Sequence, residues 1–129
     1  MNVLRNVHGA LVGRGVMLDV HPLGIDIAVR AAGQGLGFVD ASKFARVVDA
    51  MDRALDSQIA EGLFVDVREL RRHVAERFDD AAEALEHADG WVNLRLPAAV
   101  RRRLRETDEQ SVELIESIRY RLLRKRSPR

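Results

Sequence analysis

The segment Met1–Pro22, MNVLRNVHGALVGRGVMLDVHP, decides the fold, because it contains the pattern of a helix, a tight turn and a strand in immediate succession. Its first part carries apolar residues at helical intervals of three and four, at Val3, Leu4, Val7 and Leu11. We therefore expect a helix over residues 2–11, ended by the glycines of the turn at residues 13–15.

The apolar run after this turn predicts a strand. Residues 16–20, VMLDV, lie between Gly15 and Pro22 and contain one polar residue, Asp19. A nearly continuous apolar run of this length is typical of a strand buried on both faces in a parallel or mixed sheet.

Two further segments have clear helical patterns. Over residues 41–57 the spacing is four, three and four, at Phe44, Val48, Met51 and Leu55, and Asp40 or Ser42 can cap the helix. A second helix is expected over residues 97–105. Pro97 opens it at the first position, where a missing N–H group costs nothing.

Periodicity alone leaves two segments open between helix and strand. Leu70, Val74 and Phe78 fit one face of a helix running over residues 67–88, but they also share one face of a strand. Residues 112–124 are equally ambiguous. Helical spacing there competes with the alternation of Ile118, Tyr120 and Leu122 that is typical of a half-buried strand.

A resemblance to a known family favours strands in both places. The opening segment, and the later segment Glu69–Trp91, ELRRHVAERFDDAAEALEHADGW, resemble the back half of class I (Rossmann-like) S-adenosylmethionine-dependent methyltransferases. This resemblance covers the chain from Val3 to about Lys125. It implies antiparallel late strands near 63–67, 70–78 and 113–124, and a helix over 80–89 that Asp79 or Asp80 caps and Gly90 ends.

The fold class implied by the resemblance is α/β. We expect one incomplete methyltransferase-like domain over residues 1–129, with a disordered basic tail at 125–129. Its sheet would be a mixed, partial Rossmann-like sheet with a parallel-type strand near 16–20, and the closing strand would run antiparallel to the others.

The resemblance also implies what the chain lacks. The matching passage lies past the middle of the family's domain, so the part that binds S-adenosylmethionine would be absent and the isolated chain would have no cofactor and no catalytic activity. S-adenosylmethionine would be the cofactor of a full-length enzyme, in which Met1 is an internal methionine. The strand at 16–20 would be left with an unpaired edge, which a homodimer, a separately encoded N-terminal half or an altered packing of the N-terminal segment would resolve.

A glycine run offers weak cofactor-binding candidates at Gly33, Gly35 and Gly37. Glycines of this kind let a backbone approach a nucleotide. The spacing is not G-x-G-x-x-G, and Asp66, the nearest acidic residue that might hold a ribose, is too far along the chain. We favour a mobile connection that acts as a lid over a substrate.

Two residues at the end of the first strand are weak candidates for facing a substrate, namely Asp19 and His21. Ligands of open α/β sheets bind outside the carboxyl ends of strands, and a histidine there can act as a base near neutral pH. The alternative for His21 is a solvated turn residue. The other histidines show no metal-ligand spacing, so no metal site is expected.

Composition adds only loose limits. The 21 basic and 20 acidic residues nearly balance, cysteine is absent, and no apolar run is long enough for a membrane span. We therefore expect a cytoplasmic protein without a membrane interaction. Basic clusters at 99–105 and 119–125 support an alternative function, a small homodimeric binding or regulatory module that contacts nucleic acid, although acidic segments interrupt them and make nucleic acid the weaker partner.

Overall fold

The computed structural model describes residues 3–107 and 110–127. Its elements follow one another along the chain as α1 (Val3–Ala10), β1 (Val16–Pro22), β2 (Ala28–Ala31), β3 (Gln34–Phe38), α2 (Ser42–Ala60), β4 (Phe64–Phe78), α3 (Ala81–Asp89), α4 (Ala98–Arg105) and β5 (Val112–Lys125). The helices expected from the sequence are all present, with ends shifted by at most a few residues. The N-cap of α2 is Ala41, without a side-chain cap, so neither Asp40 nor Ser42 holds the expected position.

All strand pairs of the sheet are antiparallel. β5 is the central strand: β4 pairs with it along one side, β1 and β2 follow each other along the other side, and β3 pairs with β2. The expected mixed, Rossmann-like sheet with a parallel-type strand near 16–20 is therefore wrong. The apolar run identified a strand correctly, but apolarity does not encode strand direction, and alternate residues of β1 are in fact exposed on one face.

The two ambiguous segments are both strands, and they pair with each other. Phe64–Phe78 forms one strand where two were expected, with a bulge between Asp66 and Arg68, and it runs against Val112–Lys125 over its whole length. The ladder between them satisfies backbone groups that a helix would have paired within itself. A single helix over 67–88 is therefore wrong: residues 67–78 belong to β4, and a helix, α3, begins only at Ala81.

The connection between β1 and α2 contains a hairpin that the sequence analysis did not predict. β2 and β3 pair around the turn at Ala32 and Gly33, with a bulge between Val29 and Arg30. The expected mobile connection is instead part of the sheet, and Leu36 is buried.

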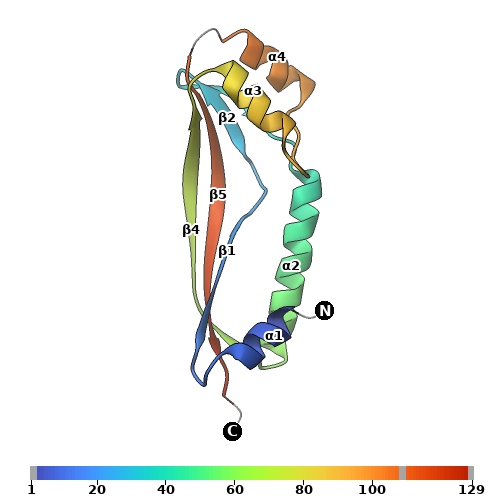
Figure 1. Cartoon of the computed structure of the whole chain (residues 1–129), viewed down its shortest axis with the longest axis vertical. Helices are drawn as coiled ribbons and strands as arrows, with labels where there is room; N and C mark the ends of the chain where they lie inside the picture. Colours follow the sequence, from blue (N-terminus) through green and yellow to red (C-terminus); the bar gives the residue numbers. More distant parts are fainter. Residues whose placement is uncertain (1–2, 108–109, 128–129) are drawn as a thin grey trace.

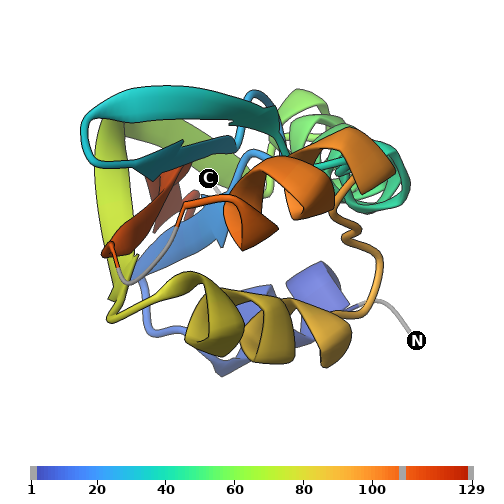
Figure 2. The same cartoon turned by 90° about the horizontal axis from the view of Figure 1, so that it is seen from above.

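The long β4–β5 ribbon twists, so opposite faces of β5 are buried at its two ends. Near α3 and α4 the buried side chains are Val112 and Leu114, whereas near α1 the buried apolar side chain is Leu123, which has the opposite parity. Right-handed twist accumulated over a long ribbon produces this exchange of faces. All four helices therefore lie to one side of the ribbon (Figure 1), and the view from above shows α3 and α4 as separate layers at one end (Figure 2).

The ends of the elements show how local chemistry sets their bounds. Asp80 caps α3 by accepting a hydrogen bond of 2.9 Å from the backbone N–H of Glu83, and Gly90 follows its last turn, as expected. Pro97 precedes α4 by one residue. Of the expected disordered tail, Lys125 belongs to β5, the Arg126 N–H donates to the carbonyl of Leu63, and residues 128–129 lie outside the described part.

Candidate functional site

Charged side chains gather between the sheet and α2, and Arg119 of β5 lies at their centre. Its guanidinium donates to both carboxylate oxygens of Asp52 on α2, with 3.1 Å between NH1 and Oδ2. The same group donates to Nε2 of His21 on β1 at 3.1 Å, and its Nε lies 3.7 Å from the Glu69 carboxylate on β4. One buried arginine thus connects α2 with three strands.

His21 and Asp19, the two residues suggested as facing a substrate, both belong to this cluster. Asp19 Oδ2 lies 3.1 Å from His21 Nδ1, without the alignment of a hydrogen bond, and Asp52 Oδ1 lies 3.6 Å from His21 Nε2. Because Nε2 accepts from Arg119, it carries no proton in this arrangement, and the network assigns the imidazole proton to Nδ1.

This environment makes His21 a poor general base. Its side chain is 8% exposed, so the alternative of a solvated turn residue does not describe it. The lone pair that a base would use is already taken by a guanidinium group. Asp19 and His21 therefore belong to the charged cluster in which Arg119 and Asp52 join the sheet to α2.

Arg121 repeats the arrangement two residues further along β5. Its NH2 donates to Asp56 on α2 at 3.0 Å and to Asp66 on β4 at 2.9 Å. Hydrogen bonds to Asp52 and to Asp66 raise the pKa of Arg119 and of Arg121 respectively, against the opposing effect of burial. Both guanidinium groups remain charged and hold α2 to β4 and β5.

Two features of the sequence are consistent with this network. Asp52 and Asp56 are four residues apart on one helix face, where like charges repel unless a cation lies between them. Arg119 and Arg121 have the same parity as Leu123, which is buried. Pairing these signals required knowing that α2 lies beside β5.

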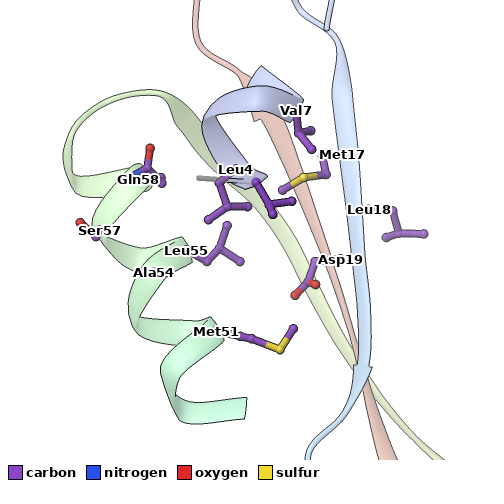
Figure 3. A pocket seen from close by; sticks show the side chains of 11 residues that line it. Leu4, Val7, Met17, Leu18, Asp19, Met51, Ala54, Leu55, Ser57 and Gln58 are labelled. Atoms are coloured by element: carbon purple, nitrogen blue, oxygen red, sulfur yellow. The ribbon is translucent and has the colours of Figure 1, made fainter. Parts of the chain in front are cut away.

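A pocket of about 840 Å³ opens next to the network, between α1, β1 and α2 (Figure 3). Met17 and Asp19 point from β1 toward α2, whereas Leu18 points away. The apolar residues that line the pocket are Val3, Leu4, Val7, Met17, Leu18, Met51, Ala54 and Leu55. Among its polar members is Gln58, which is 6% exposed and whose Oε1 has no hydrogen-bond partner.

The second edge of β1 has no partner among the described strands. Lys125 N donates to Gly15 O, and Leu23 N donates to Ser117 O. Hydrogen-bonded pairs alternate with non-bonded pairs along an antiparallel ladder. Because Gly15 and Leu23 bond to β5, the odd-numbered residues of β1 bond to β5 and the even-numbered residues do not. The backbone N–H and C=O groups of Val16, Leu18 and Val20 therefore point outward, as does the carbonyl of Pro22.

The side chains on the outer face of β1 are apolar and exposed. Val16, Leu18 and Val20 are 56%, 58% and 48% exposed. The register places Leu122 and Tyr120 of β5 beside them on the same face, and Leu70 of β4 beyond. Edge strands of native proteins are usually protected by charge, proline or bulges, and Val16–Val20 has none of these on its outer face.

The edge of β4 shows that protection clearly. It carries a bulge at Asp66 and Arg68 and a series of charged side chains, at Arg68, Glu69, Arg71, Arg72, Glu76 and Arg77. We conclude that the β4 edge is blunted, whereas the β1 edge is open to pairing.

The glycine run has a packing role in this fold. Gly33 forms the hairpin turn at φ 75°, and Gly35 lies opposite Arg30. At Gly37, φ is 130° and a Cβ atom would come within 2.8 Å of Val100 Cγ2 on α4. The run therefore lets α4 approach β3, where Arg103 donates to the carbonyl of Leu36 at 2.8 Å.

The remaining candidates are dispersed. His73 lies 3.3 Å from the Ser117 hydroxyl, and His87 contacts the rings of Phe78 and Trp91. Over residues 3–107 and 110–127, no group of three or more His, Cys, Asp or Glu side chains is arranged to hold a metal ion. Of the basic clusters, Arg119 and Arg121 point inward, and Arg101 donates to Asp89.

No family model, no curated protein and no solved structure matches this chain. In the part of the chain that the structure describes, none of the helices has the length and apolarity needed to cross a membrane.

Proposed function

We propose that the chain is a methyltransferase-like protein that does not bind S-adenosylmethionine by itself and functions as part of an assembly. In this assembly, β1 pairs with a strand of the part that holds the cofactor. The observation that carries the proposal is the free apolar edge of β1, with outward N–H groups at Val16, Leu18 and Val20.

Two further observations support it. The opening helix, turn and strand resemble those of the methyltransferase family, and that resemblance implies a strand at 16–20 whose second edge needs a partner. The family's closing strand runs antiparallel to its neighbours, as β5 does between β1 and β4, although in this sheet every other strand pair is antiparallel as well.

Calorimetry with S-adenosylmethionine and S-adenosylhomocysteine tests the first half of the proposal. We expect no heat of binding with the isolated chain. Micromolar binding would overturn the proposal and would make the Gly33–Gly37 hairpin the first region to examine.

The DNA upstream of the Met1 codon tests the second half. We expect a reading frame, continuous or separate, that encodes a D-x-G-x-G-x-G segment, and micromolar binding of S-adenosylmethionine by the combined protein. Leu18→Pro should weaken that binding, because it removes an outward N–H group, whereas Leu70→Lys on β4 should not. Absence of such a segment, or equal binding by both variants, would contradict the proposal.

The second candidate function is a homodimeric binding module. It is favoured by the near symmetry of Val16–Val20 about Leu18. Contact with nucleic acid is the weaker part of this candidate, because carboxylates already pair with Arg119 and Arg121. Binding to a DNA duplex that falls steeply with salt would favour it, and no binding at low salt would remove it.

A further inference from the structure

We propose that two copies of the isolated chain pair through β1, antiparallel, about a two-fold axis at Leu18. This pairing rests on the proposed function, because it uses the same edge of β1. When no strand of another protein is present at that edge, a second copy of the chain is the partner. Cofactor binding tests the proposed function, whereas the association of identical chains tests this pairing.

Backbone geometry permits this register. Pairing about Leu18 places Leu18 opposite its copy and Val16 opposite Val20 of the second copy. All three residues have outward N–H and C=O groups, so each pair can exchange both of its hydrogen bonds. Pro22, which has no N–H group to donate, falls outside these pairs.

Side-chain chemistry selects this register over its neighbours. A two-fold axis at Leu18 places apolar residues opposite apolar residues on the outer face and sets Asp19 opposite Met17. An axis at Asp19 would place two carboxylates opposite each other and would use Pro22, which lacks a donor. An axis at Met17 would extend the pairing into the turn at Arg14.

The surroundings of β1 extend the apolar contact. Val3 of α1 and Met51 of α2 line the pocket on the inner side of β1 and are about half exposed. On the outer side, Leu18 and Val20 continue the apolar surface of Tyr120 and Leu122. A second copy at this edge would cover apolar groups on both sides of the strand. The charged side chains along the edge of β4 would prevent a second copy from pairing there.

Sedimentation of the purified chain and its variants provides the first experiment. We expect a species of twice the 14.5 kDa chain mass at micromolar concentration. Leu18→Lys should raise its dissociation constant about tenfold or more, because two ammonium groups would then face each other. Leu70→Lys, on the same sheet face but on β4, should leave the constant unchanged.

Leu18→Pro separates edge pairing from side-chain effects. Its N–H group points outward, so the ladder to β5 keeps all its donors and the variant should stay folded as a monomer. Met17→Pro is the matched control, since it removes a donor to β5 and should unfold the chain. Circular dichroism distinguishes the two results. If Leu18→Pro unfolds, Leu18→Lys still decides the question.

Single cysteines test the register, because the chain contains none. Leu18→Cys should form a disulfide-linked dimer. Val16→Cys and Val20→Cys should do so only when mixed, since each lies about 13 Å along the strand from its own copy. A monomeric chain, a dimer unaffected by Leu18→Lys, or cross-linking of Leu70→Cys in place of Leu18→Cys would overturn the proposal.

Discussion

Arg119 on β5 and Asp52 on α2 form a two-point ion pair, with 3.1 Å between NH1 and Oδ2. Their positions are 67 residues apart in the sequence, and the pair joins the middle of α2 to the sheet. It connects the helix to β1 through His21.

Loss of the Arg119 guanidinium should destabilise the fold strongly. In Arg119→Met, the carboxylates of Asp52 and Asp19 would face His21 without the cation between them. We expect a loss of about 3 kcal/mol in the free energy of unfolding, measured by urea denaturation. Arg124→Met, at an exposed position of the same strand, should change it by less than about 0.5 kcal/mol. Equal effects would mean that the pair contributes little.

Glu116 should make stability depend on pH. Burial, and then the neighbouring Glu76, raise the pKa of Glu116 above its ordinary value of 4.5. The folded state holds this proton more tightly than the unfolded chain, so stability falls as pH rises from about 4.5 through the higher folded pKa.

Glu116→Gln tests this pH dependence. The variant should match the unmodified chain below pH 4.5 and should melt on the order of 1–3 °C higher at pH 7. Glu113→Gln, which removes a 2.8 Å ion pair with Arg77, should bring no such gain. If Glu116→Gln raised the melting temperature equally below pH 4.5 and at pH 7, the pH dependence of stability could not be assigned to Glu116.

Gly37 and Gly35 should respond differently to substitution by alanine. Gly37→Ala combines a φ of 130° with a 2.8 Å approach to Val100, and we expect a loss of about 1–3 kcal/mol in unfolding free energy. Gly35→Ala meets nothing within 4 Å and should stay within about 0.5 kcal/mol. Thermal denaturation of both variants would check this. Similar losses of stability in the two variants would mean that both glycines matter for the same reason, and that the contact of Gly37 with α4 is not the cause.

The cap of α3 offers an independent test of local structure. Asp80→Ala removes the acceptor of the Glu83 N–H, and we expect a loss of about 1 kcal/mol in urea denaturation. Asp79→Ala keeps its backbone N–H bond to Glu83 Oε2 and should lose less. The reverse order would assign the cap to Asp79.

Element types were predictable because they depend on local patterns. The spacing of Phe44, Val48, Met51 and Leu55 and the caps of α3 reflect short-range chemistry that any folded context preserves. The resemblance to methyltransferases indicated strands in the two ambiguous segments, and both are strands. The β2–β3 hairpin escaped prediction because Gly33, Gly35 and Gly37 suggested a loop.

The candidate site was predictable only in part. Asp19 and His21 were recognised as a pair near the end of β1. Their roles depend on Arg119 and Asp52, whose positions are distant in the sequence. A histidine whose Nε2 is free and one whose Nε2 accepts from a guanidinium have the same local sequence.

The sequence by itself determined the positions of the four helices and of the strand at 16–20, because propensity, periodicity and capping act over a few residues. Only the tertiary structure decided strand direction and the inward turn of Arg119 and Arg121. These features arise from backbone pairing and twist between distant segments, and the opening VMLDV run is compatible with either strand direction.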